Sequence, residues 1–120
     1  MRKILVIDDN QEIVELTKKR LEVSGYSVIT AGGGLEGLDK VRNEKPDLII
    51  LDIIMPDKDG FEVLKELKKE EATRRIPVIM LSAKSETSSL LNGEEYGAID
   101  YFIKPCDWQE ILKYIKKYLG

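Results

Sequence analysis

Short apolar runs alternate with amphipathic stretches along the whole chain. The runs are nearly uninterrupted, which is typical of strands buried on both faces of a parallel sheet. Between them, apolar residues recur every three or four positions, as they do on the buried face of a helix. The pattern predicts strands over residues 4–7, 26–30, 48–51, 77–81 and 101–103.

A helix is predicted after each of these strands. Gly25 is suited to end the first helix, and the second ends before Pro46. The fourth, within residues 85–96, has the weakest pattern because this stretch is rich in Ser and Thr. Asp107 and Glu110 resemble a capping box at the start of the last helix. Apolar stripes are predicted on the first, second, third and fifth helices. In this order they are Ile13, Leu16 and Leu21; Leu35, Leu38 and Val41; Val63, Leu64 and Leu67; and Ile111, Leu112, Ile115 and Leu119.

This alternation of strands and helices predicts a single α/β domain over residues 1–120. Parallel strands need crossover connections, which are right-handed and are usually helices. The expected architecture is a (βα)5 three-layer sandwich, with helices on both faces of one sheet. A chain of 120 residues is long enough for one compact domain and leaves no room for a second.

Polar residues stand where the predicted strands end. Asp8 and Asp9 follow the first strand, Asp52 the third, Ser82 the fourth and Lys104 the fifth. In an open parallel sheet the carboxyl ends of all strands meet at one edge, and ligands bind in the crevice outside it. We therefore expect these carboxylates, the hydroxyl and the ammonium to share one crevice.

The crowding of carboxylates predicts a bound cation. Two carboxylates ~4–5 Å apart repel each other by roughly 3–4 kcal/mol at an effective dielectric constant of ~20. Hard oxygen ligands, without His or Cys, favour Mg²⁺ over zinc or copper. Lys104 and Ser82 would then contact a phosphate held beside the ion, so the set indicates phosphoryl transfer to a carboxylate. The residue types leave open which aspartate is the nucleophile.

The composition excludes several other kinds of chemistry. The chain has no histidine, which excludes the usual zinc sites, a Ser–His triad and a role as phosphohistidine donor. Its single cysteine, Cys106, fits a reducing compartment. The net charge of −3 argues against direct nucleic-acid binding. With neither a signal-peptide pattern nor an apolar run of ~20 residues, the chain is expected to be cytoplasmic and not to bind a membrane.

The sequence resembles the receiver domains of bacterial two-component response regulators, the CheY-like family. The resemblance spans essentially the whole chain and rests on five stretches taken together. It implies a flavodoxin-like fold with a parallel five-stranded sheet of order 2-1-3-4-5. The matching stretches are residues 4–9, 46–56, 59–60, 76–83 and 97–105.

The resemblance also implies a role for each site residue. Asp52 would be the phosphoacceptor. Asp9 and Asp52 would bind Mg²⁺ directly, together with the backbone carbonyl of Ile54, and Asp8 would act mostly through a metal-bound water.

Three further residues would respond to the phosphoryl group. Lys104 would contact it, while Ser82 would move toward it and Tyr101 would follow inward. This coupled movement would reshape the surface of helix four, strand five and helix five, as a two-state element biased by a new dianion.

The partners implied by the family are proteins. The phosphoryl donor would be a sensor histidine kinase or a histidine phosphotransfer protein, and the output a downstream protein or an attached domain. The receiver would be a monomer or a phosphorylation-dependent dimer, and a switch that catalyses only its own phosphorylation and dephosphorylation. Candidate kinase-docking residues are Asn10, Ile13, Leu16, Pro105 and Cys106.

Three alternatives to a phosphorylated receiver remain at this point. A phosphatase of the haloacid dehalogenase type would need Asp-x-Asp after its first strand, where this chain has Asp8-Asp9-Asn10. A flavodoxin-like nucleotide module would need phosphate-binding amides there, not carboxylates. A degenerate receiver would lack part of the intact set. Within the receiver hypothesis, the chain is either a free-standing regulator or the receiver of a longer one.

Overall fold

The computed structural model describes residues 1–53, 55–83, 100–104 and 108–119, with the backbone alone at residues 82, 83 and 100–104. The predicted fourth helix lies outside the described residues. Among the described helices, none has both the length and the apolar character needed to cross a membrane.

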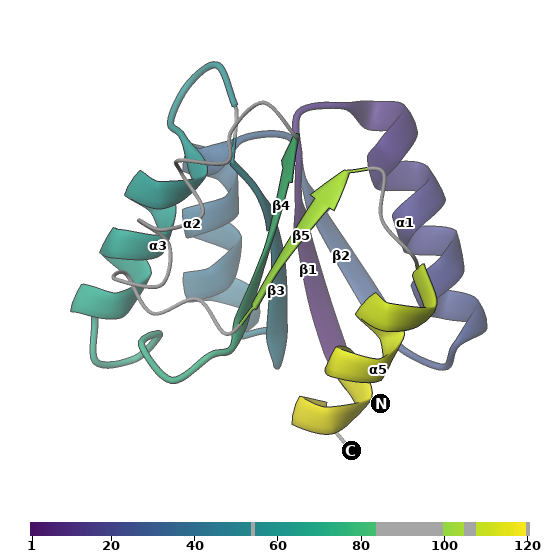
Figure 1. Cartoon of the computed structure of the whole chain (residues 1–120). Helices are drawn as coiled ribbons and strands as arrows, with labels where there is room; N and C mark the ends of the chain where they lie inside the picture. Colours follow the sequence, from purple (N-terminus) through teal and green to yellow (C-terminus); the bar gives the residue numbers. More distant parts are fainter. Residues whose placement is uncertain (54, 84–99, 105–107, 120) are drawn as a thin grey trace.

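Five parallel strands form one sheet in the order β2-β1-β3-β4-β5 (Figure 1). Both the parallel pairing and the strand order agree with the predicted flavodoxin-like α/β fold. The elements are β1 (Lys3–Ile7), α1 (Gln11–Val23), β2 (Ser27–Ala31), α2 (Gly34–Glu44), β3 (Leu48–Asp52), α3 (Gly60–Lys69), β4 (Val78–Ala83), β5 (Asp100–Lys104) and α5 (Trp108–Leu119).

Helices cover both faces of the sheet, which explains the uninterrupted apolar runs. Figure 1 shows α2 and α3 on one face and α1 and α5 on the other. Along β3, Ile49 and Leu51 belong to the core under α2 and α3, while Leu48 and Ile50 belong to the core under α1 and α5. Since successive side chains of a strand point to opposite faces, a strand between two helical layers must be apolar at every position.

The apolar stripe of α1 differs from the predicted one. Val14, Thr17 and Leu21 are its buried residues, whereas Leu16 is 50% exposed. The helix begins at Gln11, directly after its N-cap residue Asn10. The side chain of Asn10 accepts hydrogen bonds from the N–H groups of Glu12 and Ile13.

The stripe of α2 differs from the prediction at one position. Leu38 and Val41 are buried as predicted, but Leu35 is 57% exposed, and Gly37 is buried against the sheet. Glycine is required at position 37 because a Cβ there would lie 2.5 Å from Cδ1 of Ile7, a side chain with 0% exposure. The close approach of α2 to β1 therefore depends on a missing side chain.

Replacing Gly37 by alanine tests this close packing. Alanine raises helix propensity by ~1 kcal/mol, but forcing a methyl group against Ile7 costs ~1–3 kcal/mol. We expect Gly37→Ala to lower the free energy of unfolding, measured by urea denaturation. Asn43→Ala, at an exposed position of the same helix, is the matched control and should not destabilise. A Gly37→Ala protein as stable as the wild type would contradict the packing argument.

Candidate metal centre

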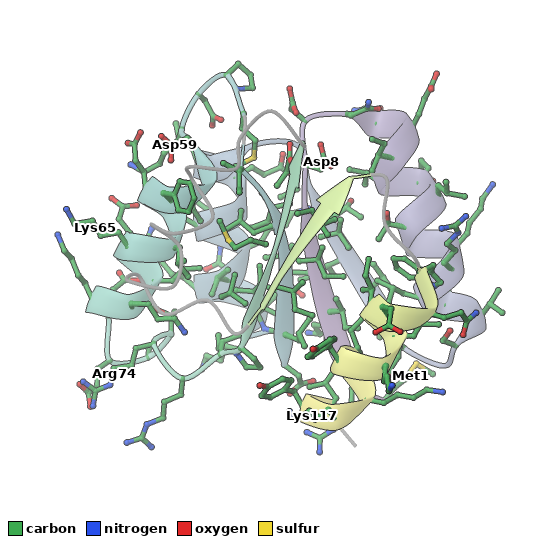
Figure 2. All side chains as sticks on the ribbon, viewed as in Figure 1. Met1, Asp8, Asp59, Lys65, Arg74 and Lys117 are labelled. Atoms are coloured by element: carbon green, nitrogen blue, oxygen red, sulfur yellow. The ribbon has the colours of Figure 1, made fainter. Side chains whose placement is uncertain are left out.

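Two neighbouring strands bring three aspartates together at the carboxyl edge of the sheet. β1 and β3 pair with Ile7 opposite Leu51, so Asp8 and Asp52 follow at the same level. Asp9 is the next residue along the chain. One carboxylate oxygen from each of the three aspartates lies within 4.8 Å of the others. Figure 2 shows Asp8 at the edge toward which the strand arrows point.

The three carboxylates differ in their exposure to water. Asp8 is 3% exposed and Asp52 is 9% exposed, whereas Asp9 is an exposed residue. Asp8 is also fixed locally, since its Oδ1 accepts a hydrogen bond of 3.0 Å from the N–H of Asn10. The cluster therefore has a rigid protein side and an open side, where a cation can keep some of its water.

A divalent cation suits this cluster on electrostatic grounds. Two carboxylate oxygens within 4.8 Å of each other repel by roughly 3 kcal/mol or more at an effective dielectric constant of ~20. A cation removes this repulsion and replaces it with attraction. The oxygen-only donor set is of the kind that Mg²⁺ binds through one or two carboxylates while it keeps several waters. The aspartates can therefore hold a divalent metal.

The segment after Asp52 folds back tightly on the strand end. The N–H of Gly60, the first residue of α3, donates a hydrogen bond of 2.7 Å to the carbonyl oxygen of Ile53. A Cβ at Gly60 would overlap the carbonyl oxygen of Asp52. Because the two lie so close, the backbone around Asp52 is held by the start of α3.

Strands β4 and β5 extend the same edge on the other side of Asp52. Asp52 lies opposite Leu81, and Ala83 lies opposite Lys104. The backbone therefore puts Ser82 and Lys104 at the strand ends where the sequence predicts them. Their side chains, and that of Tyr101 in β5, lie outside the described part of the structure.

The remaining predicted site residues divide into two groups. Asn10 caps α1 with its side chain, Ile13 is half-buried, and Leu16 is exposed. The predicted metal-binding carbonyl of Ile54 and the predicted docking residues Pro105 and Cys106 lie outside the described residues.

The sequence analysis did not single out Asp57 as a functional residue. Its carboxylate accepts hydrogen bonds from the N–H groups of Gly34 and Leu35, at the start of α2. A signal was present in the sequence, because Gly32 and Gly33 precede this helix and neither glycine can cap it with a side chain.

Comparison with known proteins identifies the family. Residues 4–116 match the family model described as the response regulator receiver domain. The chain belongs to the response regulator receiver domain family. The receiver domain therefore takes part in two-component signalling, in a family of signalling switches.

Individual relatives agree with this identification. Over 118 residues, 98% of the receiver domain, it is 46% identical to PhoP of Bacillus subtilis, a transcriptional regulatory protein of alkaline phosphatase synthesis. It spans about half the length of that relative (48%). It is 38% identical to protein PilH of Pseudomonas aeruginosa, covering 99% of PilH. The structure of the chemotaxis protein CheY4 of Vibrio cholerae superposes with a TM-score of 0.90 at 31% identity, over 99% of each chain.

Removing one charge from the cluster tests its electrostatics. We expect Asp9→Asn to raise the free energy of unfolding of the metal-free receiver by about 1 kcal/mol, less than the full pairwise repulsion because Asp9 is exposed. Urea denaturation in the presence of EDTA measures this. Glu71→Gln removes the same charge from a residue whose side chain is 81% exposed and which pairs with Arg74; it should leave stability within ~0.5 kcal/mol. Equal effects of the two substitutions would contradict a repulsive cluster.

Proposed function

We propose that Asp52 accepts a phosphoryl group from the phosphohistidine of a partner protein in a Mg²⁺-dependent reaction. The partner is a sensor histidine kinase or a histidine phosphotransfer protein. The observation that carries this proposal is the approach of Asp8, Asp9 and Asp52 to within 4.8 Å of one another, in a chain of the receiver family.

The position of Asp52 in the sheet favours it as the acceptor over Asp8 and Asp9. It ends β3, the central strand, with the other two aspartates on the β1 side and the ends of β4 and β5 on the opposite side. A phosphoryl group on Asp52 would thus lie between a metal held from one side and the residues Ser82 and Lys104 on the other. Neither Asp8 nor Asp9 has such a position.

The metal would be held by the carboxylates of Asp9 and Asp52 and by the backbone carbonyl of Ile54. Asp8, which is 3% exposed and accepts from Asn10, would act through a metal-bound water. When bound, Mg²⁺ would supply charge neutralisation for the incoming phosphoryl oxygens.

During transfer, an Asp52 oxygen would form a bond to phosphorus as the bond between phosphorus and the histidine nitrogen breaks. The departing imidazole would keep the electron pair of that bond and take up a proton. Lys104 would balance the charge of one phosphoryl oxygen, and the Ser82 hydroxyl would donate to another. The receiver would catalyse only this reaction and the hydrolysis of its own acyl phosphate.

The output would follow from the pairing of β4 with β5. Tyr101 lies opposite Met80, and Ser82 lies opposite Ile103, so a shift at the end of β4 is transmitted directly to β5. Movement of Ser82 and Tyr101 toward the phosphoryl group would then reshape the surface formed by the fourth helix, β5 and α5. A downstream protein or an attached output domain would read this surface, in the cytoplasm.

The donor protein would dock beside the carboxylates. Leu16, which is 50% exposed on α1, would be an apolar contact for the donor. Asn10, Ile13, Pro105 and Cys106 would complete the docking surface.

Phosphorylation by a small donor tests the acceptor assignment. We incubate the receiver with acetyl phosphate and Mg²⁺ and measure the intact mass. The wild-type protein should gain one phosphoryl group (~80 Da), and Asp52→Ala should gain none, because it lacks the nucleophile.

Two controls make this result specific. Asp39→Ala removes an exposed carboxylate from α2 and should be labelled like the wild type. EDTA should suppress labelling of the wild type. Labelling of Asp52→Ala to the wild-type level would overturn the assignment of Asp52, and full labelling in EDTA would overturn the requirement for a metal.

A further inference from the structure

Helix α2 is capped by a residue from another part of the chain. Its own N-cap residue, Gly33, has no side chain to accept a hydrogen bond. Instead, Oδ1 of Asp57 accepts from the N–H of Gly34 at 3.1 Å and Oδ2 accepts from the N–H of Leu35 at 3.0 Å. Asp57 lies in the β3–α3 loop, the segment that joins Asp52 to α3.

Glycines let this loop lie directly on the start of α2. A Cβ at Gly33 would lie 2.9 Å from Oδ1 of Asp57. A Cβ at Gly34 would lie 2.8 Å from both Cβ and the carbonyl oxygen of Lys58. The two segments therefore fit together only because these positions carry no side chain.

The loop is held on its other side as well. The ammonium group of Lys58 lies 3.3 Å from a carboxylate oxygen of Glu66 in α3, and Asp59 caps α3 by accepting from the N–H of Glu62. Met55 is 6% exposed and belongs to the core under α2 and α3. Met55, Lys58 and Asp59 of the loop are thus held against the two helices that flank it.

The charge of Asp57 strengthens its contact with α2. The N–H groups of Leu35 and Gly34 hold the pKa of the Asp57 carboxyl below its ordinary value. The group is therefore an anion at neutral pH, placed where the helix dipole is positive.

We propose that Asp57 is a positioning residue for the metal site, a clamp that holds the β3–α3 loop on the start of α2 and so keeps the carboxylate of Asp52, which directly precedes this loop, where it can share an ion with Asp9. This inference rests on the proposed function. The clamp raises the affinity for the ion, because a loop that is already in place adds no entropic cost of ordering when the ion binds. The chain would thus use α2, which carries none of the proposed ligands, to set its affinity for Mg²⁺.

The test separates clamping of the loop from capping of the helix. Asp57→Ala removes both functions. The double variant Asp57→Ala/Gly33→Ser restores a cap from within α2: Gly33 has the extended backbone of an N-cap residue, and the nearest atoms that a Cβ there would meet belong to the removed carboxylate. The melting temperature and the Mg²⁺ dissociation constant, from isothermal titration calorimetry, are measured for wild type and both variants.

We expect Asp57→Ala to melt at a lower temperature and to bind Mg²⁺ roughly tenfold more weakly, the lower end of the effect of losing an outer-shell partner. The double variant should recover the melting temperature but not the affinity. In both variants, phosphorylation by acetyl phosphate should need more Mg²⁺ and should approach the wild-type rate once the metal is saturating.

Several results would overturn the clamp. Wild-type Mg²⁺ affinity in Asp57→Ala would show that the loop needs no such anchor. Recovery of affinity together with the melting temperature in the double variant would show that Asp57 only caps α2. A wild-type receiver that binds no Mg²⁺ would instead overturn the proposed function, and the clamp with it.

Discussion

The parallel pairing of β1 with β3 is the contact on which the site depends. It places Ile7 opposite Leu51, and so brings Asp8 and Asp9 to the level of Asp52. No local feature of the sequence brings Asp8 and Asp9 close to Asp52, since Asp8 directly follows β1 and Asp52 ends β3. The sheet imposes a repulsive arrangement that isolated segments would avoid, and burial of the apolar strand residues on both faces stabilises the fold against that repulsion.

Much of the fold could be predicted because each strand is buried on both sides. Strand β3 reads as a continuous apolar run for this reason, and its residues alternate between the two cores. The faces of the helices were harder to predict. Leu16 and Leu35 were assigned to the buried stripes of α1 and α2, but both are exposed. Helical periodicity alone cannot reveal that Thr17 or Gly37 is the residue that faces the sheet.

The site shows the same division between what the sequence predicts and what needs the structure. The sequence predicted that the aspartates gather, because the carboxyl ends of all strands in a parallel sheet meet at one edge. This reasoning could not favour one aspartate over the others as the proposed acceptor, since all strand ends are equivalent until the strand order is known. With β3 at the centre of the sheet, Asp52 is the carboxylate flanked on both sides. The role of Asp57 needed the structure too, because its partner helix begins 23 residues earlier in the chain.

A cluster of like charges binds a metal well only if it cannot relax when it is empty. Without a cation, repulsion favours a state in which the carboxylates separate, and any such movement would have to be reversed on binding. The restraints against it lie outside the cluster: the N–H of Asn10 on Asp8, the N–H of Gly60 on the carbonyl of Ile53, and Asp57 on the start of α2. Each is made by backbone N–H groups at a helix start or in the turn before one. If the cluster holds a cation as we propose, its affinity would depend on how α1, α2 and α3 begin as well as on the carboxylates themselves.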